Sequence, residues 1–89
     1  MLNRHRYSVI KYEAEVEDGG RVDVICRDDF TKKKTALEYY KSMILNEEKH
    51  NFFWNLDGKY KEVEILIYLY QDFKVIKRSI IKKRGATQK

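Results

Sequence analysis

Apolar and polar residues alternate in two stretches of the first third of the chain, residues 6–16 and 21–27. A period of two is that of a β-strand with one buried side. Between the stretches, Gly19-Gly20 supplies the positive φ angles that a tight hairpin turn requires. The pattern therefore predicts a β-hairpin. The residues expected on its buried side are Ile10, Tyr12, Ala14, Val16, Val22, Val24 and Cys26.

The period then changes to three and four, which is typical of one face of a helix. This spacing predicts a helix from about residue 31 to about residue 48. Asp28, Asp29 or Thr31 is expected to cap its start by accepting hydrogen bonds from the first turn. Glu47 lies near the other end, where the helix dipole disfavours a carboxylate, and is expected on a solvated face. The apolar stripe consists of Ala36, Leu37, Tyr40, Met43 and Ile44.

Residues 51–70 permit two interpretations. In the first, Asp57-Gly58 forms the turn of a hairpin between a short strand at 51–56 and a long strand at 59–70. In the second, 51–56 is a loop that carries aromatic residues. The long strand is apolar on both sides, which is typical of a central strand whose second face is also covered. One side holds Val63, Ile65, Ile67 and Leu69, and the other holds Leu66, Tyr68 and Tyr70.

Residues 73–83 fit a helix nearly as well as a strand. The β-branched residues and the short connection after residue 70 favour a strand that contributes Ile76 and Ile80 to the core. The predicted fold class is α+β, with one antiparallel sheet of four to five strands and a single helix on one face, in the order β-β-α-(β)-β-β. Residues 1–84 are expected to form one domain and 85–89 a frayed tail.

Charge is unevenly distributed over the 89 residues, whose net charge is +5. Positions 1–72 carry 12 basic and 14 acidic residues, whereas positions 73–89 carry 7 basic and none acidic. Basic residues along a strand can follow a phosphate backbone, and exposed aromatic residues beside them can stack on bases. Lysine on an edge strand also protects against edge-to-edge aggregation, and an acidic protein partner is a further alternative.

The sequence contains no motif that is typical of a catalytic or metal-binding site. One cysteine, Cys26, and two histidines, His5 and His50, form no spacing that suits zinc, and no glycine-rich phosphate loop is present. We expect no enzyme activity, no cofactor and no metal. The lone cysteine, the charged start of the chain and the short uncharged runs predict a cytoplasmic protein without a membrane span.

Aromatic residues make up 13% of the chain, more than a core of this size easily buries. Tyr39 and Tyr40 are adjacent in the predicted helix, and 52–54 is a run of three aromatic residues, so neither set can point wholly inward. These residues either close the edges of the core or form an exposed patch for a partner or a second copy.

The chain is short, free of proline and rich in Lys, Ile, Tyr and Asn, and the segments "SVIKYEAEVEDGG" and "DFTKKKTALEYYKSM" show this composition. In this it is similar to small accessory proteins of phages and mobile elements from low-GC Gram-positive bacteria. That resemblance implies a binding protein, often an inhibitor of a host enzyme or defence complex, and it transfers no site residue.

Together these observations favour a non-enzymatic module that binds a host protein as an inhibitor or modulator, or that forms a homodimer through an uncovered sheet face or edge. The alternative is direct binding of nucleic acid. The residues predicted to bind a protein partner are Tyr39, Phe53, Trp54, Tyr68, Tyr70, Lys77, Arg78, Lys82 and Lys83. The residues predicted for nucleic acid are Arg4, Arg6, Lys74, Lys77, Arg78, Lys82, Lys83 and Arg84.

Overall fold

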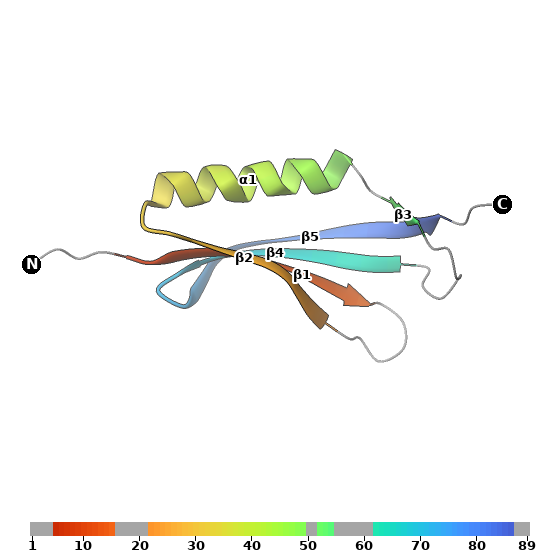
Figure 1. Cartoon of the computed structure of the whole chain (residues 1–89), viewed down its shortest axis with the longest axis horizontal. Helices are drawn as coiled ribbons and strands as arrows, with labels where there is room; N and C mark the ends of the chain where they lie inside the picture. Colours follow the sequence, from red (N-terminus) through yellow and green to blue (C-terminus); the bar gives the residue numbers. More distant parts are fainter. Residues whose placement is uncertain (1–4, 16–21, 50–51, 55–61, 87–89) are drawn as a thin grey trace, which may run out of the picture.

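A computed structural model describes residues 5–15, 22–49, 52–54 and 62–86 of the chain. It confirms the predicted α+β fold, with four antiparallel strands and one helix against one face of the sheet (Figure 1). A short fifth strand adds in parallel at one edge, which gives the sheet order β2-β1-β4-β5-β3. The elements are β1 (Tyr7–Glu15), β2 (Val22–Phe30), α1 (Lys33–Lys49), β3 (Phe52–Trp54), β4 (Glu62–Gln71) and β5 (Lys74–Ala86).

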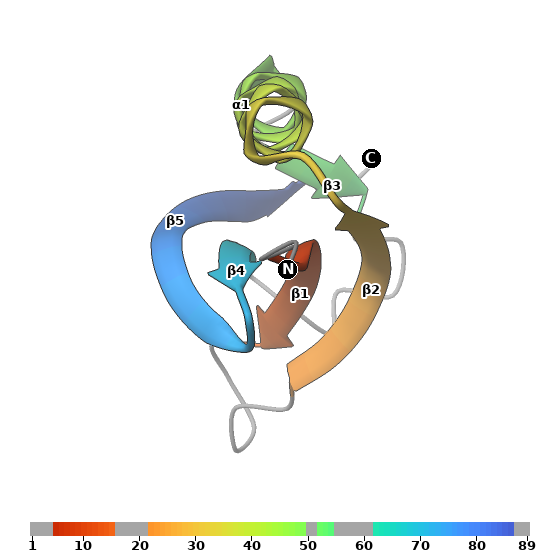
Figure 2. The ribbon, with the colours of Figure 1, turned by 90° about the vertical axis from the view of Figure 1, so that its left-hand side faces the viewer.

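The core lies between α1 and the two middle strands of the sheet, β1 and β4. Seen end-on, the sheet is strongly twisted, and α1 lies over one of its faces (Figure 2). Residues of β4 are buried at every second position, as expected for a strand that turns one side to a helix. Val9, Ile67 and Leu69 are fully buried, and Ala36 and Tyr40 of α1 pack on them.

The far end of α1 is fastened to the sheet by a buried carboxylate. Glu47 is only 7% exposed, which corrects the expectation of a solvated face. Lys11 of β1 donates to one of its oxygens at 2.9 Å, and Lys83 of β5 binds the other. Burial alone would raise the pKa of Glu47, but the bonds from the two lysines outweigh it and hold the pKa below the ordinary 4.5. The helix therefore lies across β1, β4 and β5, and Glu47 binds it to β1 and to β5.

The predicted inward side of the first hairpin is wrong. In β1, Tyr7 and Val9 are buried against α1, whereas Ile10, Tyr12 and Ala14 point to the opposite face. Both faces of this strand carry apolar residues, so alternation alone could not distinguish them. Lys11 had been assigned to the solvent-facing side of the strand. Its aliphatic stem instead lies on the helix-facing side, and its ammonium group reaches Glu47.

In β2, the prediction fails because of a bulge. The register shifts between Lys11 and Tyr12, which leaves Ile25 as an extra residue in β2. Val22 and Val24 are consequently exposed on the face opposite α1, while Cys26 is half-buried beside Tyr39. Val16 and the expected Gly19-Gly20 turn lie outside the described residues.

The helix starts at Lys33, two residues later than predicted. Asp28 and Asp29 belong to β2 and bond to the side chains of Tyr39 and Ser8, respectively, so they do not cap the helix. The side chain of Thr31 is exposed between the two elements.

The region 51–56 contains a short strand, but the predicted hairpin with the following strand is wrong. Residues 52–54 pair in parallel with residues 84–86 of β5, and Asp57-Gly58 lies outside the described residues. The pairing also extends β5 two residues into the predicted tail.

Residues 74–86 form a strand, as the β-branched residues favoured. A second bulge, at Ile76, follows the turn. Ile76 and Ile80 are exposed and do not join the core; Ile81, on the other face, packs against it instead. Phe73 lies in the turn between β4 and β5 and not in the strand.

Candidate functional site

The two faces of the sheet differ in what covers them. α1 lies over one face, and no other described helix or strand covers the opposite face, which we call the open face (Figures 1 and 2). Cross-strand pairs define its members, because residues opposite each other point to the same side. The open face comprises Ser8, Ile10, Tyr12 and Ala14 of β1, Val22, Val24, Arg27 and Asp29 of β2, Glu64, Leu66, Tyr68 and Tyr70 of β4, and Val75, Arg78, Ile80 and Lys82 of β5.

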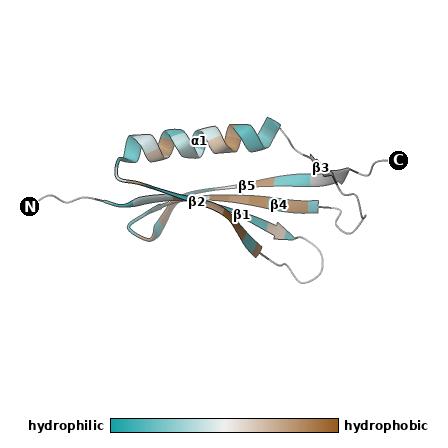
Figure 3. Cartoon of the chain, viewed as in Figure 1, coloured by the Kyte–Doolittle hydropathy of each residue, from teal (hydrophilic) through white to brown (hydrophobic). Residues whose placement is uncertain are grey.

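Four exposed large apolar residues lie on this face: Val22, Val24, Val75 and Ile80. Among the described residues, eight large apolar side chains are exposed, and seven of them lie on the sheet or its β4–β5 turn. Val24 is 62% exposed and Ile80 is 54% exposed. The remaining one, Leu45, lies on the outer side of α1. Figure 3 shows β4 as hydrophobic along most of its length, although α1 covers only one of its sides.

Three tyrosines form the centre of the open face. The rings of Tyr12 and Tyr68 meet edge-on with centroids 5.4 Å apart, and those of Tyr68 and Tyr70 are 6.0 Å apart. The hydroxyls of Tyr12 and Tyr70 are hydrogen-bonded at 3.0 Å. Burial and this hydrogen bond raise the pKa of Tyr70 to about 12. The three rings therefore support one another, and Tyr70 is neutral at physiological pH.

Charged residues border the tyrosines on both sides. Across the β4–β5 pairing, Arg78 lies opposite Tyr68, and Lys82 lies opposite Glu64. On the β2 side, the Nε–H of Arg27 donates to Asp29 at 3.2 Å, and the Ser8 hydroxyl donates to the same oxygen at 2.6 Å. The Ser8 bond, followed by that of Arg27, lowers the pKa of Asp29, so this carboxylate is charged and already partnered.

Four of the predicted partner-binding residues come together on the open face: Tyr68, Tyr70, Arg78 and Lys82. Tyr39 lies elsewhere, between α1 and β2, with its ring 5.2 Å from that of Phe30 and its hydroxyl donating to Asp28. That bond, with burial, raises the pKa of Tyr39 to about 12. Tyr39 therefore holds the helix to the sheet edge.

The remaining predicted residues are dispersed. Lys77 and Lys83 occupy the helix-facing side of β5, where Lys77 is exposed and Lys83 is bound to Glu47. Lys74 and Arg6 are exposed near the β4–β5 turn. The side chains of Phe53, Trp54 and Arg84 lie outside the described part of the chain, as does Arg4. The described cations of β5 are thus divided between two faces and do not form one continuous basic track.

Sequence reasoning missed most of the apolar part of the open face, because it assigned Ile10, Tyr12, Val24 and Ile80 to the core. One signal was present: β4 is apolar on both sides, so the sheet has two apolar faces, and one helix can cover only one of them.

Among the described residues, no group of three or more His, Cys, Asp or Glu is placed to hold a metal ion. No helix within the described ranges has the length and apolar character needed to cross a membrane.

No family model, no curated protein and no solved structure matches this chain. The assignment of a site therefore rests on the geometry of the open face.

Proposed function

We propose that the chain is a small non-enzymatic binding module that uses its open face to hold another protein, and that it inhibits or modulates that partner in the cytoplasm. The observation that carries the proposal is the apolar face opposite α1, which no described element covers and on which Val22, Val24, Val75 and Ile80 are exposed. A contiguous apolar surface bordered by polar residues is typical of a protein interaction site. Such a module acts by covering a surface of its partner.

The arrangement of the face favours a protein over nucleic acid. Protein interfaces enrich tyrosine and arginine around an apolar centre, and the open face has this composition, with Tyr12, Tyr68 and Tyr70 between Arg27 and Arg78. A nucleic-acid surface instead needs a run of unpaired cations and aromatic faces on which bases can stack. Here the described cations are dispersed, and the tyrosine rings pack against one another, edge-on for Tyr12 and Tyr68 and tilted for Tyr68 and Tyr70.

The partner we expect presents apolar side chains together with carboxylates. The arginines at the two sides of the face, Arg27 and Arg78, would lie at the rim of the contact, where charge steers association. An acidic rim on the partner would be complementary to them.

Affinity capture with matched variants tests the proposal. The tagged chain, Ile80→Lys and Leu45→Lys are each used on bacterial extract with and without nuclease treatment, and captured proteins are compared. Both substitutions place a lysine at a side chain more than half exposed, but only Ile80 lies on the open face. The proposal predicts a protein captured by the wild type and by Leu45→Lys and lost by more than tenfold with Ile80→Lys, since a charge in an apolar contact costs more than 1.4 kcal/mol.

Two outcomes contradict it. Capture that Ile80→Lys retains places the contact elsewhere, and capture that nuclease abolishes for all three proteins indicates nucleic acid. Light scattering on the purified chains covers the remaining case: a dimer that Ile80→Lys dissociates would mean that the occupant is a second copy.

A further inference from the structure

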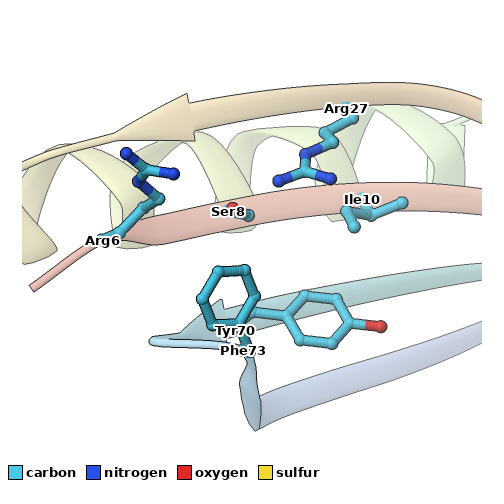
Figure 4. A pocket seen from close by; sticks show the side chains of 6 residues that line it. All are labelled: Arg6, Ser8, Ile10, Arg27, Tyr70 and Phe73. Carbon is cyan, nitrogen blue, oxygen red and sulfur yellow. The ribbon is translucent and has the colours of Figure 1, made fainter.

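A hollow of about 190 Å³ lies where the open face meets the β4–β5 turn. Sites for small-molecule ligands start at roughly 300 Å³, so this hollow is the size of one side chain. It is lined by two guanidinium groups, one hydroxyl and three apolar or aromatic side chains. Figure 4 shows Arg6 and Arg27 along one side, Tyr70 and Phe73 along the other, and Ser8 and Ile10 between them.

The turn beside the hollow carries an unusual residue. Asp72 and Phe73 have φ angles of 50° and 72°, so both adopt the left-handed conformation of a two-residue hairpin turn. Glycine is the residue that favours the second of these positions, and a bulky side chain there is an outlier. Phe73 is also 82% exposed, so burial within this chain does not compensate for the conformation. Strain of this kind concentrates at functional sites.

The conformation is held by Asp72. Its carboxylate accepts the backbone N–H of Arg6 at 2.9 Å and contacts the ring of His5 at 2.5 Å, and its own N–H donates to the Arg6 carbonyl at 2.8 Å. The Arg6 and His5 contacts lower the pKa of Asp72, so this carboxylate is engaged inside the turn. These bonds fix Phe73 next to Arg6.

Both guanidinium groups retain binding capacity. Arg27 uses its Nε–H on Asp29, and none of its terminal nitrogens has a partner among the described residues. The guanidinium of Arg6 likewise has no hydrogen-bond partner within the described ranges. The two carboxylates nearby, Asp29 and Asp72, are already bonded and do not line the hollow. An anion that enters would therefore meet two guanidinium groups above an apolar floor.

We propose that this hollow receives a carboxylate attached to an apolar group, presented by the partner protein as an anchor residue. Arg6 and Arg27 would bind the carboxylate, and Tyr70 and Phe73 would contact the apolar part. The proposal rests on the function proposed for the open face and names the chemistry recognised at one end of it.

A fragment titration tests the hollow without the partner. The ¹⁵N-labelled full chain is titrated with 3-phenylpropionate and, as its neutral match, with 3-phenylpropanamide, while backbone amide shifts are recorded. We expect the carboxylate to shift signals of Arg6, Ser8, Arg27 and Phe73, and the amide to bind on the order of tenfold more weakly. Arg27→Gln should weaken the carboxylate by a similar factor, whereas Lys82→Gln, on the same face but away from the hollow, should not.

Phe73→Gly supplies a readout that a purely structural role would not produce. Because glycine relieves the left-handed conformation, we expect Tm to rise by about 4 °C while binding of 3-phenylpropionate weakens severalfold. A fall in Tm with unchanged binding would overturn the proposal. So would equal binding of acid and amide, shifts confined to other parts of the sheet, or binding of inorganic phosphate with no response to 3-phenylpropionate.

These outcomes are separate from the test of the open face. Failure of the fragment to bind would remove the anchor hollow alone, whereas retention of capture by Ile80→Lys would remove the open face as the contact surface.

Discussion

Glu47 is the position at which one substitution should most disturb the fold. It lies in the last turns of α1, is 7% exposed, and is bound by Lys11 on one strand and Lys83 on another. Glu47→Gln keeps the shape of the side chain and removes its charge. Both lysines then remain in a largely dry site, at 19% and 13% exposed, without a counter-charge.

The size of the effect follows from this burial. Removing one partner of a buried ion pair costs about 3–5 kcal/mol, because the remaining charge is left uncompensated. Both lysines lose their counter-charge, but their ammonium groups can turn partly towards water. We therefore expect the free energy of unfolding to fall by about 3 kcal/mol, the lower end of that range. A domain of this length has a total stability of roughly 4–13 kcal/mol. The variant should therefore lose a large fraction of it.

Urea unfolding followed by circular dichroism measures this loss. Glu48→Gln is the matched control, because Glu48 is the next residue of the same helix and is exposed. We expect it to change the free energy of unfolding by less than about 0.5 kcal/mol.

The pH dependence gives a second check. The pKa of Glu47 is lowered in the folded state, so its contribution is complete above the ordinary 4.5 and is lost as pH falls through the lowered value. The difference between wild type and Glu47→Gln should shrink over that acidic range. If Glu47→Gln is no more destabilising than Glu48→Gln at neutral pH, the buried ion pairs do not hold the helix to the sheet.

Three further predictions concern the faces of the strands. Lys83→Ala should destabilise the protein by more than 1 kcal/mol and Lys77→Ala by under about 0.5 kcal/mol in urea unfolding, because only Lys83 binds a buried carboxylate; equal effects would contradict this. Ile81→Lys should cost more than about 2 kcal/mol and Ile80→Lys less than about 0.5 kcal/mol, since only Ile81 packs on the core; the reverse order would place the wrong face against the helix. The raised pKa of Tyr70 gives stability that is present below pH 10 and lost as pH rises through about 12, so Tyr70→Phe should show a smaller alkaline loss in the same assay, and an identical loss would refute it.

Elements were predictable from the sequence where the periodicity was unambiguous. The helix followed from its period of 3.6 and the central strand from its run of apolar residues on both sides, and β-branched residues correctly favoured a strand after Asp72. The parallel pairing of β3 was not predictable, because the turn signal at 57–58 favoured a local hairpin and a three-residue strand carries little pattern of its own.

The orientation of strands was predicted less well than their existence. In β1 both faces are apolar enough to be buried, and the choice between them depends on where α1 lies. In β2 and β5, bulges at Ile25 and Ile76 alter the alternation, and a bulge leaves no fixed signature in a short sequence.

The candidate site was half predictable for the same reason. Tyr68, Tyr70, Arg78 and Lys82 followed from the two-sided apolar pattern of the central strand and the charge of the next one. The exposure of Ile80 was not predictable, because the sequence pattern of a strand does not show whether its second face is covered by another element. The hollow beside Phe73 depends on backbone angles in a turn, which the sequence does not display.

Site-specific photo-crosslinking reports directly which face of the protein contacts its partner. A benzophenone amino acid is placed at Ile80 on the open face or at Leu45 on the outer side of α1, both of which are exposed. After irradiation in bacterial extract, we expect a discrete protein adduct from position 80 and none from position 45. An adduct from position 45 alone would contradict the assignment of the open face as the surface that holds the partner.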